Sequence, residues 1–253
     1  MSEARNVIAV LVAMPEEVRP IARRLGPFRR EMLGAFPLYR FSGKGMEVWL
    51  VRSGMGWKRA SEAASLVRAH HPRLIVSAGF GGGVREGIAT GDVVLAAGIM
   101  SLSGDAVTPV AHMDNSRMLA YLRESFPASP FGIVEGCVIT CQGIWRKTEA
   151  RRLLPEGLYH PVLDMETAAV AEAALGDGIP FLAVRSISDA WDEELLFSIE
   201  EITDRDLNIS IRRVLAAIAR DPRILPQMIR LARNGGKAGK NLALVLERIM
   251  EKG

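Results

Sequence analysis

Runs of apolar residues mark the strands that we expect at the centre of this protein. Val7–Ala13, Leu74–Ala78 and Phe181–Ile187 contain few polar residues and do not alternate. Both faces of such strands should be buried, as in a sheet that is covered by helices on both sides. The pattern predicts further strands over Leu38–Phe41, Met46–Arg52, Asp92–Ala96 and Ile133–Thr140.

Helical patterns lie between these strands. Pro15, with Glu16 and Glu17 behind it, is typical of a first helical turn, and this helix should run to Leu25, just before Gly26-Pro27. Two more helices are predicted over Trp57–Ala69 and Met165–Leu175. Strands that alternate with helices predict one α/β domain over residues 1–221, a three-layer sandwich with a mixed central sheet flanked by helices.

The last part of the chain has a different character. Residues 211–253 carry ten basic and three acidic side chains, a net charge of +7, against −4 for the rest. Ile224–Leu231 and Leu242–Met250 place basic and apolar residues at helical spacing, around an expected break at 234–236. We therefore predict that residues 222–253 form a basic helical extension on a complete core.

This extension has two interpretations. A basic amphipathic helix can make peripheral contact with an anionic membrane. It can also pack on the core or on a second subunit. Nucleic-acid binding is not expected, because no aromatic stacking residues are interleaved with the cations.

Composition limits the compartment and the chemistry. No apolar run approaches the roughly 18 residues of a membrane span, and the N-terminus has no secretory pattern. The two cysteines, Cys137 and Cys141, have neither CxxC spacing nor a nearby His, so no metal site is expected. So few cysteines suit a reducing cytoplasm.

Candidate chemistry follows the strands, where open α/β sheets place their ligands. Taken singly, each segment has a structural explanation, because first-turn acids favour the helix dipole, glycines form tight turns and Asp caps helices. Together they bring carboxylates and bare backbone to one edge of the sheet. The segments are Ala13–Val18 (AMPEEV), Ser77–Val84 (SAGFGGGV), Leu163–Ala168 (LDMETA) and Val184–Asp189 (VRSISD).

Cleavage of the bond between a purine and ribose needs such a set of groups. The departing base is a poor anion, so an acid must protonate one of its ring nitrogens. The sugar passes through an oxocarbenium-like state, as in other glycoside hydrolyses. A second carboxylate in different surroundings can then activate the attacking water.

These motifs resemble those of the nucleoside phosphorylase superfamily over roughly Val7–Arg220, and within it the 5′-methylthioadenosine/S-adenosylhomocysteine nucleosidases. AMPEEV resembles the first-strand motif, SGMG at Ser53–Gly56 the second, and SAGFGGGV the glycine-rich loop. LDMETAAVA resembles the ribose-binding segment and VRSISDAWD the catalytic-acid segment. Five motifs in the family order make the resemblance strong.

The resemblance implies a role for each site residue. Asp189 would donate to N7 of the purine, and Glu17 would be the general base on water. Glu166 would hold the ribose hydroxyls. The remaining pocket would be lined by Met14, Phe80, Gly81, Gly82 and Met165, braced by Arg185, with the adenine against Ile144 and Trp145. The resemblance also implies a small purine nucleoside as substrate, no cofactor and a homo-oligomer, commonly a dimer.

Three departures from the family pattern affect this reading. Asp164 stands where the nucleosidases usually have Glu, which should be a tolerable change just outside contact, and Phe80 replaces a small hydroxyl residue. Ser77 stands where bacterial phosphorylases carry a phosphate-binding Arg. This favours water over phosphate as acceptor, although Arg52 and Arg85 could substitute and keep a phosphorylase, with phosphate as co-substrate, open.

Two other readings stay open. One is a non-catalytic nucleoside-binding protein that retains the pocket. The other concerns the substrate, because Phe80 and the basic tail are similar to the hopanoid-associated branch of the superfamily. That resemblance implies a nucleoside with a large lipid-like group.

Overall fold

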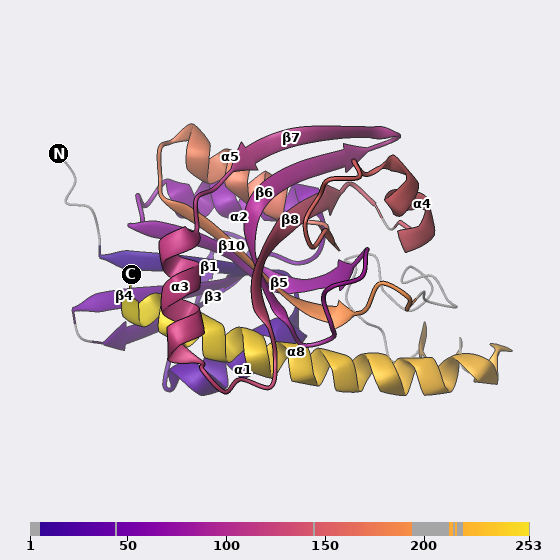
Figure 1. The fold of residues 1–253 in the computed structure, drawn as a ribbon. Coiled ribbons are helices and arrows are strands. Elements are labelled where there is room, and N and C mark those ends of the chain that lie inside the picture. The colour runs from indigo at the N-terminus through magenta and orange to yellow at the C-terminus, as the bar shows by residue number, and fades with distance from the viewer. Residues whose placement is uncertain are drawn as a thin grey trace.

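The computed structural model describes residues 6–43, 45–143, 145–193, 213, 214, 216 and 220–252. In this part of the chain a mixed ten-stranded sheet is flanked by helices, as predicted (Figure 1). The strands are β1 (Val7–Val12), β2 (Arg29–Leu33), β3 (Phe36–Gly43), β4 (Met46–Arg52), β5 (Leu74–Gly83), β6 (Val93–Ser103), β7 (Ala106–His112), β8 (Ile133–Cys141), β9 (Val162–Asp164) and β10 (Phe181–Asp189). The helices are α1 (Pro15–Leu25), α2 (Trp57–Arg68), α3 (Ser116–Ser125), α4 (Lys147–Leu153), α5 (Thr167–Gly176), α8 (Leu225–Lys252) and the short 3-10 turn η1 (Pro222–Ile224).

The sheet is partly closed on itself, which the sequence did not predict. Its order is β10-β6-β8-β9-β5-β1-β4-β3-β2, and β10 also pairs in parallel with β5. Strands β5, β9, β8, β6 and β10 therefore form a ring, while β1, β4, β3 and β2 continue outward. The β5–β10 register shifts between Ile187 and Asp189, a bulge that changes the direction of the last residue of β10.

Both faces of the central strands are buried, as the uninterrupted apolar runs predicted. On β1, Ala9 and Leu11 join the cluster under α2 and α5, whereas Ile8 and Val10 join the cluster under α1, α3 and α8. Helix α5 is alanine-rich, and the small side chains allow it to lie close to the sheet. The backbone at the carboxyl ends of β1, β5 and β10 is consequently held from both sides.

The C-terminal segment differs from its prediction. Residues 225–252 form one continuous helix, so the break expected at 234–236 is wrong. Its second half is part of the core, because Leu242, Val245, Leu246 and Ile249 are fully buried against the sheet. The first half runs outward past the end of α1 (Figure 1). Three mid-helix glycines cost helix stability, but two of them, Gly235 and Gly239, lie one turn apart and face Phe80.

Several elements were longer than predicted or were missed. The glycine-rich segment was expected to be a loop after Ala78, yet β5 continues through it to Gly83. The pattern gave no prediction for β2, β7, β9, α3 and α4. Among the described residues no helix combines the length and hydropathy that crossing a bilayer requires.

Candidate active site

Glu17 lies at the end of β1, inside the first turn of α1. It is 2% exposed, and its carboxylate accepts hydrogen bonds from three backbone N–H groups. Ala13 and Met14 donate to Oε2 at 2.8 and 2.7 Å, and Phe80 of β5 donates to Oε1 at 2.8 Å. A carboxylate has about four acceptor positions, so one position is left for a further donor such as water.

The surroundings of Glu17 favour proton uptake. Burial raises the pKa of Glu17, although hydrogen bonds from Met14, Phe80 and Ala13 and the charge of Arg185 act in the opposite direction. A raised pKa is the shift that a general base for water needs, because it makes the carboxylate a better proton acceptor.

The glycines of β5 allow other groups to approach the strand closely. A Cβ on Gly79 would lie 2.7 Å from Oε1 of Glu17, and one on Gly81 would lie 2.4 Å from Cγ1 of Val162. A Cβ on Gly82 would lie 2.9 Å from Oδ2 of Asp189. Glycine is therefore required along the segment by its neighbours, since real Cβ atoms do not come so near.

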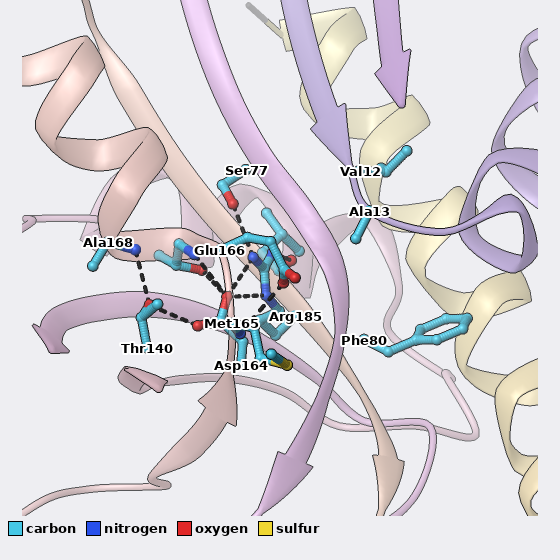
Figure 2. Close-up of polar contacts among 12 residues, drawn as sticks. Val12, Ala13, Ser77, Phe80, Thr140, Asp164, Met165, Glu166, Ala168 and Arg185 are labelled. Carbon is cyan, nitrogen blue, oxygen red and sulfur yellow. Dashed lines mark hydrogen bonds and ion pairs between the residues drawn. The ribbon is translucent and has the colours of Figure 1, made fainter. Parts of the chain in front are cut away.

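A buried ion pair lies beneath this strand. The side chains of Arg185 and Asp164 are each 1% exposed, with Nη2 and Oδ2 2.6 Å apart. Arg185 also donates to the hydroxyl of Ser77, and Asp164 accepts from the hydroxyls of Thr140 and Thr167 (Figure 2). That Asp164 is a tolerable change just outside substrate contact stays a prediction. Within the protein it is the acceptor that holds Arg185 and the start of α5 in place.

Glu166 stands at the start of α5, next to this pair. Its Oε1 accepts from the backbone of Gly56 at 2.8 Å, so the SGMG turn before α2 meets the Met-Glu segment. Burial and the neighbouring charge of Asp164 raise the pKa of Glu166 to about 8. A small cavity adjoins it, lined by Leu11, Val12, Ala13, Ser53, Ser77, Ala78, Glu166, Val170 and Arg185.

Asp189 ends β10 on the other side of the glycine segment. Its Oδ1 accepts from the hydroxyl of Ser188 at 2.6 Å. Its Oδ2 forms an ion pair with Nζ of Lys147, the first residue of α4, whose side chain is 9% exposed. The sequence gave no signal for Lys147, because a lysine in a presumed loop is usually solvated.

The structure places most of the predicted site residues along one edge of the sheet. Met14, Gly81, Gly82, Met165 and Glu166 come from the ends of β1, β5 and β9 and the start of α5, and Arg185 comes from the middle of β10. Phe80 donates its N–H to Glu17, but its ring is turned toward α8 (Figure 2). Trp145 packs against the apolar cluster around α4, and Ile144 lies outside the described residues.

No group of three or more His, Cys, Asp or Glu within the described ranges is arranged to hold a metal ion. The two cysteines are buried and free, and burial raises the pKa of Cys137 to about 11 and that of Cys141 to about 12. Such pKa values favour the protonated thiol at neutral pH, which is not the nucleophilic form.

Comparison with known proteins fits this arrangement. The model of the Phosphorylase superfamily matches residues 7–220, and the chain belongs to this family. Among its relatives is the 5′-methylthioadenosine/S-adenosylhomocysteine nucleosidase of Listeria monocytogenes, 29% identical over 77% of this chain and 91% of the relative. The enzyme of the same name from Actinobacillus succinogenes is 25% identical over 84% of this chain and 98% of the relative.

Solved structures share the fold. The futalosine hydrolase of Helicobacter pylori matches with a TM-score of 0.72 and 16% identity over 100% of both chains. The 5′-methylthioadenosine/S-adenosylhomocysteine nucleosidase of the same organism also gives 0.72 and 16%, over 99% of both. The predictions of fold class and family are confirmed.

Proposed function

We propose that the protein hydrolyses the N-glycosidic bond of a purine nucleoside, with adenine as base, water as acceptor and no cofactor. Its relatives in Listeria and Actinobacillus carry the name of nucleosidases that act on 5′-methylthioadenosine and S-adenosylhomocysteine. In this proposal Glu17 takes a proton from water and Asp189 passes one to N7 of the base.

One observation carries the proposal. Two carboxylates from distant parts of the sequence approach the same short segment of β5, Glu17 at Gly79 and Asp189 at Gly82. Glu166, a third acid, lies between the strand ends, where it can accept from sugar hydroxyls. A nucleoside along the glycine segment would have an acid at its base and a second acid at its anomeric carbon.

The side chains beside the pocket support water rather than phosphate as the acceptor of the ribosyl group. Phosphate sites use Arg side chains or free backbone N–H groups. Arg85 donates to the carbonyls of Leu154 and Glu156, and Ser77 is taken up by Arg185. The backbone N–H groups of Ala13, Met14 and Phe80 are already bound to Glu17.

The test is incubation with 5′-methylthioadenosine, adenosine and inosine, each with and without phosphate, followed by chromatography of base and sugar. We expect free base and free sugar, at a rate that phosphate does not change. A sugar phosphate formed only with phosphate would indicate the phosphorylase instead. Tight binding without base release would indicate a binding protein.

Asp189→Asn tests the assignment of the acid. Asparagine keeps the shape but cannot donate a carboxyl proton, so kcat should fall about 10³-fold, within the range for general acids. Thermal unfolding should change little. Near-normal turnover would end the proposal.

We propose further that the enzyme is a cytoplasmic homodimer that touches anionic membranes through the first half of α8. The exposed Leu225 and Ile229 lie beside Arg230 and Arg233 on this helix, a pattern that suits a membrane surface. This contact would suit a nucleoside with a lipid-like group. Light scattering tests the dimer. Flotation with phosphatidylserine vesicles tests the membrane contact, which Leu225→Ser with Ile229→Ser should abolish and Leu66→Ser on α2 should not.

A further inference from the structure

Asp189 has a bonding pattern that is unusual for a group that must give up a proton. Its Oδ1 accepts from Ser188 and its Oδ2 is paired with the ammonium of Lys147. Each oxygen of the carboxyl group therefore lies against a group that can exchange a proton with it, Oγ of Ser188 or Nζ of Lys147. Of the two, the ammonium is the cation and the better proton donor.

Lys147 is the neighbour in position to supply a proton to Asp189. Its ammonium has three donors, and all three have acceptors at the end of β10: Oδ2 of Asp189, the carbonyl of Asp189 at 3.1 Å and that of Ala190 at 2.5 Å. The residue is only 7% exposed, and lysines are rarely so buried without a partner. The Cε of Lys147 lies 3.2 Å from a Cβ on Gly82, so the pair also faces the glycine segment.

We propose that Lys147 and Asp189 act as one acid, in which Lys147 positions Asp189 and supplies its proton. This deepens the proposed hydrolysis and rests on it. Nζ of Lys147 passes a proton to Oδ2 of Asp189, which passes one to N7 of the purine. The C1′–N9 bond breaks and its electron pair stays on the base. The water oxygen bonds to C1′ and its proton goes to Glu17. Solvent then returns a proton to Lys147 and takes one from Glu17.

Arg151 provides a matched control on the same helix. It ties α4 to the same segment by donating to the carbonyls of Val84 at 2.9 Å and Trp191 at 3.0 Å, and it lies over the Trp191 ring. Neither these hydrogen bonds nor the ring contact involves the Asp189 carboxylate. Loss of anchoring alone should therefore affect Lys147→Met and Arg151→Met alike.

The experiment compares two leaving groups. In Lys147→Met, kcat for 5′-methylthioadenosine should fall at least about 10²-fold, with KM changed less than about threefold. Turnover of p-nitrophenyl β-D-ribofuranoside should be nearly unchanged, because p-nitrophenolate leaves without a proton. Arg151→Met should keep kcat for both substrates within a few-fold.

Lys147→Arg separates proton supply from charge. Arginine can pair with Asp189 but does not deprotonate in proteins, so this variant should stay nearly as slow as Lys147→Met. Full recovery in Lys147→Arg would overturn the proton supply.

Other outcomes are equally decisive. Equal losses in Lys147→Met and Arg151→Met, or equal losses with both leaving groups, would overturn the inference as a whole. If the parent enzyme does not hydrolyse the riboside, kcat and KM of folded Lys147→Met and Lys147→Gln are compared for the nucleoside. A fall in kcat with KM nearly unchanged supports the inference, and a rise in KM with kcat unchanged overturns it. If the parent enzyme hydrolyses no nucleoside at all, the proposed function itself is refuted. That result differs from every outcome that overturns only the role of Lys147.

Discussion

The two carboxylates at the glycine segment of β5 are held in opposite ways. Glu17 is bound by backbone N–H groups of its own turn and of β5. Asp189 is bound by side chains, Ser188 beside it and Lys147 from a helix more than forty positions earlier. Backbone donors are present whatever the sequence, whereas side-chain donors change with one substitution. The position of Glu17, the proposed base for water, is therefore fixed by the fold, whereas that of Asp189, the proposed acid for the purine, can be adjusted by mutation.

The first prediction concerns Glu17, the carboxylate that backbone donors hold. Glu17→Gln removes the proposed base for water, so kcat should fall about 10²- to 10⁴-fold. Unlike Asp189→Asn, this variant should lose turnover of p-nitrophenyl β-D-ribofuranoside too, because both substrates need activated water. Steady-state kinetics with both substrates checks this. If Glu17→Gln and Asp189→Asn show the same ratio of kcat losses for the nucleoside and the nitrophenyl riboside, the division of roles is contradicted.

The second prediction concerns the ion pair between the two sides. Asp164→Ala leaves Arg185 charged, buried and without its partner, which should lower the free energy of unfolding by about 3–5 kcal/mol. Asp177→Ala removes the exposed pair with Arg68 and should cost less than about 1 kcal/mol. Urea denaturation of both variants checks this. Equal losses in the free energy of unfolding would show that the buried ion pair of Asp164 contributes no more than the exposed one.

The third prediction is a pH dependence of stability. The pKa of Glu166 is raised to about 8 in the folded protein from 4.5, so the folded state keeps a proton that the unfolded chain loses. The contribution of Glu166 to stability is full below pH 4.5 and is lost as the pH rises through about 8. In Glu166→Gln, the thermal unfolding temperature should vary less with pH between 4.5 and about 8 than in the parent. Parallel curves for variant and parent would contradict it.

Much of this architecture could be predicted from local pattern. Apolar runs located β1 and β10, and Pro15 marked the start of α1, because these signals depend on neighbours in sequence. The acids Glu17, Glu166 and Asp189 followed from motifs at strand ends. Their roles in catalysis stay predictions.

The features that were missed depend on contacts between distant segments. Glycines were taken to end β5 at Ala78, but pairing with β10 and β9 continues the strand, and close neighbours require the glycines. Lys147 is buried only because α4 folds back onto the end of β10. Gly235 and Gly236 do not interrupt α8, whose second half is fixed in the core.

The bulge at the end of β10 has a consequence for how such a site can evolve. It lets the chain re-aim Asp189 while Arg185 and Ile187 stay in register with β5. Loss of Ser188 would let Asp189 follow Ile187 directly and pair regularly with Gly82, and would remove the hydroxyl that donates to its carboxylate. A one-codon deletion could thus change how the proposed acid is aimed while Arg185 and its buried ion pair keep their register.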